Sequence, residues 1–449
     1  MDVSAHFRSK KITVMGLGLL GRGVGDTRYL AECGAELIVT DLKTREQLAE
    51  SIVELTNFPN IHFVLGEHRL EDFRGRDFIL KAAGVPLDSI YIAEAKKNNI
   101  PVRMSADLFA EISDIPIVGV TGTRGKSTVT HMLYAILKEA EKPVLLGGNI
   151  RGVSTLAFLS EVTPKHIAVL ELDSWQCQGW GEMKMSPHIA VFTTFYSDHL
   201  NYYGSTSLAT GKNPLDAYLA DKANIFLYQK TDDTLILGKQ CAPIIIEKYG
   251  NEIESKVLVI DETKLTDELV LCIPGIHNRY DAALALAAAR ALDIPDEVSR
   301  SVLESFTGVP GRLELVAEKN GVKIYNDTTA TTPEATLVAL AALRQSSEQN
   351  QNLILILGGA DKGLDMSALL LKLSEFKRVV LLAGTGTERI RVGFPNAPVF
   401  NALAPAVSDA FAHAKSGDTI LFSPAFASFG MFKNEYDRGD QFNALVLAL

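Results

Sequence analysis

Short apolar runs that end in glycine recur along the chain and are typical of strands in a parallel α/β sheet. The first is Lys11 to Gly18, KITVMGLG. The run AELIVTD, which ends at Asp41, follows as the next strand, and DFILKAAG begins near residue 77. This alternation is βαβ patterning. This pattern therefore predicts a Rossmann-like domain in the N-terminal part of the chain.

A second strand, glycine loop and helix begin at Ile115 with IPIVGVTGTRGKST. Behind the loop, the run VTHMLYAILKEA places apolar residues at i, i+3, i+4, i+7 and i+8, the spacing of one helix face. These residues are Val129, Met132, Leu133, Ile136 and Leu137. The order strand, loop, helix predicts a central P-loop ATPase-type domain.

A third segment starts near Gly308, where GVPGR interrupts a helical stretch, and continues as GVKIYND, LILILGGADKG, VVLLAG and TILFSP. These four apolar strands alternate with helical stretches such as TPEATLVALAALR, which predicts a second Rossmann-like domain. We therefore expect an α/β chain of three domains, a Rossmann-like N-terminal domain at 1–112, the central domain at 113–308 and the C-terminal domain at 309–449.

Composition agrees with several folded domains that act on small molecules. A chain of 449 residues exceeds what one core usually organises, and 47% hydrophobic residues are too many for a disordered chain. The net charge of −10 argues against a general nucleic-acid or anionic-membrane surface. No run approaches the apolar length of a membrane span. The four scattered cysteines form no CxxC pair, which indicates no zinc knuckle and fits a cytoplasmic location.

The glycine loop of the second segment is a candidate phosphate-binding site. Its residues are Gly122, Thr123, Arg124, Gly125, Lys126, Ser127 and Thr128. Backbone N–H groups at a helix start can cradle phosphate oxygens, Lys126 would contact the β/γ-phosphates, and the Ser127 hydroxyl would ligate Mg²⁺. Val120 stands where the strict GxxxxGK[ST] motif has its first glycine. The alternative interpretation is an ordinary glycine turn before a helix.

The shorter form GTxGKST is the hallmark of the Mur ligases and their relatives, the folylpolyglutamate synthases, and further motifs follow in the family's order across essentially the whole chain. They are Gly148-Asn149-Ile150, LELDSWQ from Leu170, Ser197-Asp198-His199-Leu200, YLADK ending at Lys222, GIHN ending at Asn278, Gly311-Arg312, NDTTAT ending at Thr331, GGADK ending at Lys362, and SPAFAS ending at Ser428. The chain thus resembles the Mur ligase family, and SPAFAS followed by FKN and RG resembles its glutamate-adding branch.

The resemblance implies a monomeric ATP-dependent ligase of peptidoglycan precursor synthesis. ATP would phosphorylate the carboxylate of UDP-MurNAc-L-Ala, and the amine of glutamate, expected as D-glutamate, would attack the acyl phosphate. This chemistry needs charge neutralisation at the γ-phosphate, a clamp on the acceptor and a positioned amine. L-glutamate or another amino acid stays an alternative.

The resemblance also implies two Mg²⁺ ions and their ligands. Ser127 and Glu171 would hold one ion with the ATP phosphates, and His199 the second together with Lys222, which is carbamylated in the family. Lys126, Lys222, His199 and Glu171 are thus the expected catalytic residues. Taken alone, His199 would be interpreted as a satisfied polar residue and Glu171 as a surface charge, although Glu171 ends the apolar run HIAVLEL.

Three further residues match nucleotide-binding positions of the family. Asn278 would reach the adenine, Arg312 the phosphates, and Asp327 the ribose. An asparagine at a helix start is equally typical of a helix cap.

The run Gly16 to Gly21 satisfies GxGxxG, and Asp41 lies 20 residues beyond Gly21, a pattern that alone indicates NAD binding. The resemblance assigns this site to UDP instead, with Gly18 and Leu19 among the substrate-binding residues and Thr40 or Asp41 near the uracil. Asn149 would lie nearer the sugar and peptide.

Lys362 and Ser428, assisted by Thr331, match positions that bind the carboxylates of glutamate, for which a cation and hydroxyls are suitable partners. Several positions depart from the family pattern. Arg124, Asp173, Thr194, Thr329 and Glu435 replace asparagine, serine, asparagine, lysine and an aromatic residue. Glu435 would repel a dicarboxylic substrate, so either Tyr436 supplies that contact or the amino-acid pocket differs.

Two other classes of protein compete with the ligase. A P-loop ATPase without ligase activity would release phosphate with no amine acceptor. A dehydrogenase would rest on GLGLLG alone and leave the later motifs unexplained.

Overall fold

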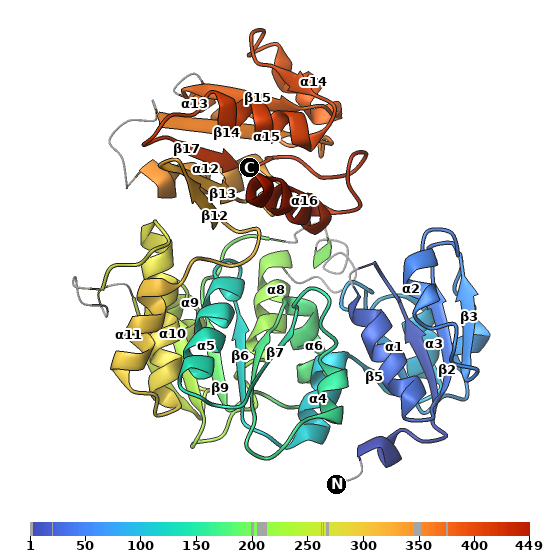
Figure 1. The fold of residues 1–449 in the computed structure, drawn as a ribbon. Helices are drawn as coiled ribbons and strands as arrows, with labels where there is room; N and C mark the ends of the chain where they lie inside the picture. The colour runs from blue at the N-terminus through green and yellow to red at the C-terminus, as the bar shows by residue number, and fades with distance from the viewer. Residues whose placement is uncertain are drawn as a thin grey trace. The chain divides into compact units, whose positions relative to one another are not determined.

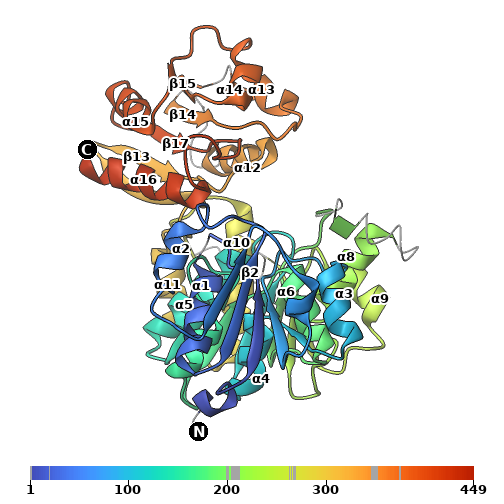
Figure 2. The same cartoon turned by 90° about the vertical axis from the view of Figure 1, so that its right-hand side faces the viewer.

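The computed structural model describes residues 3–19, 21–198, 202–203, 213–261, 263, 265, 269–344, 352–373 and 376–449. They contain three sheets, and the chain divides into two compact units (Figures 1 and 2). The first unit is Met1–Thr266 with Tyr280–Val302, and the second is Asp267–Arg279 with Leu303–Leu449. Among the described residues, no helix combines the length and hydropathy that a membrane crossing requires.

The first sheet has the strand order β3-β2-β1-β4-β5, and its neighbouring strands are parallel. The strands are β1 (Lys11–Met15), β2 (Glu36–Asp41), β3 (Ile61–Leu65), β4 (Phe78–Lys81) and β5 (Val102–Arg103). The helices are α1 (Arg22–Glu32), α2 (Ala49–Val53), α3 (Ile90–Lys97) and α4 (Ser105–Ser113), with 3-10 turns at Val3–His6 and Leu70–Phe73. Helices α1 and α3 cover opposite faces (Figure 2). The three predicted strands are confirmed as β1, β2 and β4.

The second sheet, also parallel, has the order β11-β10-β9-β6-β8-β7. Its strands are β6 (Ile117–Thr121), β7 (Val144–Gly148), β8 (Ile167–Glu171), β9 (Ile189–Phe192), β10 (Thr234–Gly238) and β11 (Lys256–Ile260). The helices that follow them are α5 (Lys126–Glu139), α6 (Ser174–Glu182), α8 (Pro214–Ala223), α9 (Ala242–Tyr249), α10 (Ile276–Ala291) and α11 (Asp296–Ser305), with a 3-10 turn at Leu156–Ser160. All five residues of the predicted apolar face of α5 are fully buried, so that prediction is confirmed.

The third sheet has the order β12-β13-β17-β14-β15-β16, in which only the β12 and β13 pair is antiparallel. Its strands are β12 (Glu314–Lys319), β13 (Val322–Asn326), β14 (Leu353–Gly358), β15 (Arg378–Leu382), β16 (Val399–Phe400) and β17 (Thr419–Phe422). The helices are α12 (Pro333–Arg344), α13 (Ser367–Leu373), α14 (Thr385–Arg391), α15 (Leu403–Ala412) and α16 (Glu435–Ala448). The four predicted strands are confirmed, and β12 and β16 are additional.

Candidate active site

The glycine loop between β6 and α5 adopts a backbone conformation that favours glycine at two positions. Gly122 has φ 141° and Gly125 has φ 85°. A Cβ at residue 122 would lie 2.0 Å from Oγ1 of Thr193, and one at residue 125 would lie 2.4 Å from Oδ1 of Asp281. The loop backbone therefore packs directly on its neighbours at the end of β6, in front of the N-terminus of α5, where an anion is favoured.

Two threonines that follow β9 hold this loop in place. The Thr194 carbonyl accepts a hydrogen bond from the Thr123 N–H at 2.7 Å, and its hydroxyl accepts one from the Arg124 N–H at 2.9 Å. The Thr193 hydroxyl donates to the Arg124 carbonyl at 2.5 Å. The departure at Thr194 thus has a structural role, which the sequence did not reveal because the contact spans 70 residues.

The ammonium of Lys126, the first residue of α5, folds back over its own loop. Its Nζ donates to the carbonyls of Gly122 and Thr123 at 3.1 and 3.2 Å. Hydrogen bonds from a cation to phosphate oxygens are stronger than those to neutral carbonyls, so a bound phosphate would compete well for this side chain. Ser127 and Thr128 follow in the first turn of α5, and Ser127 is buried.

A second buried lysine reaches the same loop from α8. Lys222 is 1% exposed, and its Nζ donates to the Gly122 carbonyl at 2.9 Å and to the Thr121 hydroxyl at 3.2 Å. Burial, and next the positive charge of Lys126, lower the pKa of Lys222 to about 7. At neutral pH a large fraction of this side chain is therefore an uncharged amine.

Glu171 and Asn149 meet at the ends of the neighbouring strands β8 and β7. Glu171 is buried, as the apolar run before it predicted. The Asn149 N–H donates to the Glu171 carbonyl at 2.7 Å, and Asn149 Nδ2 donates to Glu171 Oε1 at 3.4 Å. Asn149 Oδ1 accepts a hydrogen bond from Nη1 of Arg22 at 2.6 Å. A buried carboxylate is thus fixed at the carboxyl end of the sheet.

Two of the three predicted metal ligands, Ser127 and Glu171, lie within the described residues. Ser127 and Glu171 offer a hydroxyl and a carboxylate, hard oxygen donors that suit Mg²⁺, an ion that binds few protein ligands and keeps waters or phosphates. His199 lies outside the described residues. Within the ranges that the structure describes, no three His, Cys, Asp or Glu residues cluster as a metal site. The donors present fit an Mg²⁺ that is held mainly by nucleotide phosphates.

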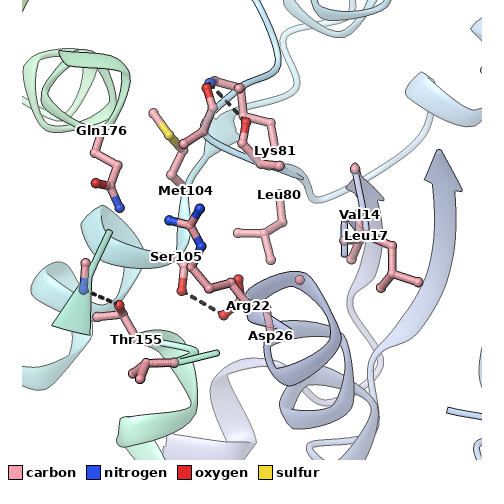
Figure 3. Close-up of a pocket in the computed structure, with 18 of the residues that line it drawn as sticks. Val14, Leu17, Arg22, Asp26, Leu80, Lys81, Met104, Ser105, Thr155 and Gln176 are labelled. Atoms are coloured by element: carbon pink, nitrogen blue, oxygen red, sulfur yellow. Dashed lines mark hydrogen bonds between the residues drawn. The ribbon is translucent and has the colours of Figure 1, made fainter. Parts of the chain in front are cut away.

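A pocket of about 180 Å³ lies in the first unit, at the carboxyl ends of β1 and β4 (Figure 3). Gly18, Leu19 and Arg22 line it from the first glycine loop and α1, and Gly148 and Gln176 line it from the second sheet's side. A pocket at the carboxyl edge of a parallel sheet is the usual position of a ligand site in α/β folds.

Asp41 is absent from the described residues that line this pocket. Its Oδ2 accepts a hydrogen bond from the Gly18 N–H at 3.0 Å, and its Oδ1 accepts one from the Lys43 N–H at 2.9 Å. In this structure, therefore, Asp41 shapes the first glycine loop. Lys81 also lines the pocket, was not predicted, and has its pKa lowered to about 8 by burial.

In the second unit, the structure places Thr331 and Lys362 together, since Lys362 Nζ donates to the Thr331 hydroxyl at 2.9 Å. Ala360 and Ala427 form an antiparallel bridge, which sets the loop of buried Ser428 beside the loop of Lys362. The three residues predicted to bind glutamate therefore come from adjacent loops.

The fully buried Arg438 lies next to these loops and was not among the predicted residues. It donates to the Thr328 hydroxyl and carbonyl at 3.1 and 2.8 Å and to the Phe426 carbonyl at 3.2 Å. Burial lowers the pKa of Arg438 to about 10, and the Glu435 carboxylate opposes this effect. Glu435 acts in the same direction on the pKa of Lys362, which burial lowers. The negative charge of Glu435 thus lies near two cations.

The other predicted nucleotide-binding residues also belong to the second unit. Asp327 is buried and accepts hydrogen bonds from the Ser423 hydroxyl at 2.7 Å and the Leu313 N–H at 3.1 Å, and burial raises its pKa to about 7. Arg312 is exposed. Asn278 lies inside α10 and donates from Nδ2 to the Pro274 carbonyl at 2.6 Å, so the alternative interpretation as a helix cap is wrong.

Comparison with known proteins identifies the family. Residues 120–289 match the Mur ligase middle domain, and residues 311–426 match the Mur ligase glutamate ligase domain. The UDP-N-acetylmuramoylalanine–D-glutamate ligase of Roseiflexus sp. (strain RS-1) is 36% identical, with 97% of this chain and 98% of that protein covered. The enzyme of the same name from Borreliella burgdorferi (strain ATCC 35210) is 35% identical, with 98% of both chains covered.

Solved structures support the same fold. The UDP-N-acetylmuramate–alanine ligase of Thermotoga maritima matches with a TM-score of 0.61 at 18% identity, covering 98% of this chain and 99% of that one. The MurF ligase of the same organism, solved with ADP, matches with a TM-score of 0.56 at 17% identity, covering 99% and 97%. The predicted class of three α/β domains is therefore confirmed, and the chain belongs to the Mur ligase family.

Proposed function

We propose that this chain is an ATP-dependent ligase that joins D-glutamate to UDP-N-acetylmuramoyl-L-alanine, a step of peptidoglycan precursor synthesis. The observation that carries the proposal is the full-length similarity to relatives named for this reaction. A glycine loop beneath Lys126 and beside the buried Lys222 supplies the chemistry that such an activity needs.

In this reaction the triphosphate of ATP lies against Gly122, Thr123, Gly125 and Thr128, with Lys126 at the β- and γ-phosphates. An oxygen of the acceptor carboxylate attacks the γ-phosphorus, the bond to the β–γ bridging oxygen breaks, and ADP leaves. The glutamate amine then attacks the carbonyl carbon of the acyl phosphate. Phosphate departs with the oxygen of the former carboxylate, and the amine loses a proton. Catalysis is mainly a matter of positioning and charge neutralisation.

Ser127 and Glu171 would hold one Mg²⁺, and His199 would contribute to a second. Bound Mg²⁺ supplies charge neutralisation at the β- and γ-phosphates. The assignment of His199 rests on the SDHL motif alone, since the residue lies outside the described ranges. Asn149 Nδ2 donates a hydrogen bond to Glu171 Oε1, and this bond orients the carboxylate of Glu171.

We propose that Lys222 is carbamylated. The lone pair of neutral Nζ forms a bond to the carbon of CO₂, and the nitrogen releases one proton to solvent, which leaves an anionic carbamate. The lowered pKa of about 7 supports this step, because the uncharged amine is the reactive form. Labelled ¹³C-bicarbonate should give a carbamate carbon resonance in the wild-type protein, and Lys222→Arg should lack it. A resonance that persists in Lys222→Arg contradicts the assignment.

The remaining predicted site residues divide between the two compact units. Gly18, Leu19 and Asn149 serve the UDP-sugar substrate directly, and Asp41 serves it by shaping the first glycine loop. In the second unit, Asn278, Arg312 and Asp327 serve the nucleotide, and Thr331, Lys362 and Ser428 bind the carboxylates of glutamate. Domain boundaries near 112 and 308 and a monomeric enzyme remain our proposals.

A phosphate-release assay tests the function. With ATP, Mg²⁺ and UDP-MurNAc-L-Ala present, we expect phosphate release only when an amino acid is added, with D-glutamate faster than L-glutamate. Acceptor labelled with ¹⁸O in its carboxylate should deliver labelled oxygen to the released phosphate. Release that ignores the amino acid contradicts the proposal and favours an ATPase without ligase activity.

A further inference from the structure

We propose that Arg22 is a positioning residue that links the pocket of the first glycine loop to the carboxylate of Glu171, with Asn149 as the connecting side chain. The proposal rests on the proposed function, because that function places Glu171 at Mg²⁺. All three residues belong to the first compact unit.

The hydrogen bonds run in one direction along this relay. Arg22 Nη1 donates to Asn149 Oδ1 at 2.6 Å, and Asn149 Nδ2 donates to Glu171 Oε1 at 3.4 Å. A guanidinium can only donate and an ionised carboxylate can only accept, so the two ends together fix which way the Asn149 amide faces. Loss of Arg22 leaves the amide held at one end alone.

The Asn149 end of the relay stands on rigid backbone. The Asn149 N–H donates to the Glu171 carbonyl at 2.7 Å, and Gly148 pairs with Glu171 in the register of β7 and β8. Gly148 has φ 82°, and a Cβ there would lie 2.1 Å from the Glu171 carbonyl oxygen. The two strands therefore touch where the amide and the carboxylate meet.

The Arg22 end is anchored independently. Asp26, one helical turn after Arg22 in α1, accepts hydrogen bonds from the Ser105 hydroxyl at 2.7 Å and the Ser154 hydroxyl at 2.5 Å. Ser154 follows Asn149 in the same loop. The face of α1 that carries Arg22 is thus tied through Ser154 to the segment that begins at Gly148, and through Ser105 to the start of α4.

Arg22 also faces the ligand pocket. Its side chain extends from α1 into the cavity, near Ser105 (Figure 3). As the first residue of α1, it places a cation where the helix dipole disfavours one, a cost that an anionic ligand offsets. A guanidinium has five donors, so it can serve a ligand anion and Asn149 together. An anionic substrate that binds Arg22 in the pocket would therefore influence the orientation of Glu171 through Asn149.

The test uses the full-length enzyme with Mn²⁺ as a paramagnetic probe of the Mg²⁺ site and a non-hydrolysable ATP analogue. We measure Mn²⁺ affinity by electron paramagnetic resonance, with and without UDP-MurNAc-L-Ala, for wild type, Arg22→Met and the control Arg28→Ala. Arg28 lies on the same helix, has a side chain that is 41% exposed, and pairs with Glu54. Removal of a residue that orients a metal ligand typically weakens metal affinity by about 10–100-fold.

We expect the substrate to tighten Mn²⁺ binding in wild type and Arg28→Ala, and Arg22→Met to lose this tightening together with about tenfold or more of its metal affinity. If Arg22→Met weakens substrate binding but keeps wild-type Mn²⁺ affinity, Arg22 is only a substrate contact and the proposal is overturned. Thermal unfolding checks the fold. Should Arg22→Met unfold, Arg22→Lys carries the same test, because it keeps the charge and lacks the planar fork.

A double-mutant cycle with Asn149→Ala separates the relay from two independent effects. Once Asn149 is absent, Arg22→Met should leave Mn²⁺ affinity unchanged within about twofold. If the fold-changes in Mn²⁺ affinity of the two single variants multiply in the double variant, Arg22 and Asn149 act independently and the relay is refuted. Failure of the proposed function is distinguishable, since wild type would then form no amide product, whereas failure of this inference leaves wild-type turnover intact and removes only the Arg22 effect.

Discussion

The first unit contains two glycine turns, one before α1 and one before α5, that have nearly the same local structure but different contacts. Helix α1 follows Gly21, with φ 80° and ψ −20°, and helix α5 follows Gly125, with φ 85° and ψ −16°. Each helix then begins with a cation, Arg22 in α1 and Lys126 in α5. Both turns thus present a helix N-terminus and a positive side chain.

The turns differ in what holds them and in where the cation reaches. In the first turn the Asp41 carboxylate accepts a hydrogen bond from the Gly18 N–H. In the second turn neutral threonine groups accept instead, as the Thr194 hydroxyl does from the Arg124 N–H. Lys126 stays over its own loop, and Arg22 reaches Asn149. Asp41 accepts from an N–H group that could otherwise bind an anion, and in the second turn Thr194 likewise accepts from the N–H groups of Thr123 and Arg124. Each turn therefore depends on its cation to attract an anion.

The largest expected effect is that of Lys126→Ala, which removes the cation of the second turn. We expect turnover to fall by about 10³-fold or more, the scale of losing a cation at a transferring phosphoryl group. Affinity for the UDP-sugar substrate, measured by calorimetry without ATP, should stay unchanged, because the first turn keeps its own cation. Lys138→Ala, exposed in the last turn of α5, is the control. Loss of UDP-sugar binding in Lys126→Ala would show that the two turns are not separate sites.

The next effect concerns Lys222, whose charge is buried against the second turn. Its pKa is about 7 in the folded protein and near 10.5 when unfolded. Between these values the unfolded chain binds the extra proton, so wild-type stability should rise with pH across this window. Lys222→Met should be the more stable protein near pH 7, by up to about 4–5 kcal/mol, and lose this advantage towards pH 10.

Denaturant unfolding of both proteins in CO₂-free buffer measures this difference. Arg22→Met keeps Lys222, so its stability should rise with pH as that of wild type does, and its difference in stability from wild type should not change across this window. An equal slope with pH for wild type and Lys222→Met would mean that Lys222 keeps an ordinary pKa.

Alanine at the two glycine caps distinguishes conformational strain from packing. Both Gly21→Ala and Gly125→Ala force a side chain into the left-handed region, at about 1–2 kcal/mol each. Only Gly125→Ala also drives a Cβ to 2.4 Å from Asp281, whereas the nearest atom at residue 21 lies 3.3 Å away. We expect Gly125→Ala to be less stable by a further 1–3 kcal/mol or so. Equal losses of stability in chemical denaturation would mean that Asp281 moves aside.

Local patterns predicted the parts of the site that lie within one strand, loop and helix. The loop from Gly122 to Thr128, the buried face of α5 and the burial of Glu171 follow from short-range spacing, and the structure contains all three. The groups that brace the loop were not predictable in the same way. Thr194 lies 70 residues from its partner, and Arg22 lies 127 residues from Asn149. Such pairs arise from strand order, for which a single sequence gives no register.

The smallest effect is expected at a third glycine turn, Gly358-Gly359 at the end of β14, where the cation Lys362 lies beyond the turn and is exposed. Burial lowers the pKa of both Lys362 and Arg438, and the negative charge of Glu435 opposes this lowering. Glu435→Gln removes a carboxylate that competes with the substrate for these cations. Because Lys362 is exposed, we expect its interaction with Glu435 to contribute about 0.2–1 kcal/mol, so the KM for D-glutamate should fall by at most about fivefold, with kcat unchanged.

Steady-state kinetics with D-glutamate as the varied substrate measures this change, and Asp440→Asn, an exposed acid in the same helix α16, is the matched control. A rise in KM would mean that Glu435 helps to bind the amino acid, for example by accepting from its ammonium group. The third turn would then differ from the other two in kind, because its anion would serve the substrate directly, whereas the carboxylate of Asp41 serves the protein's own loop.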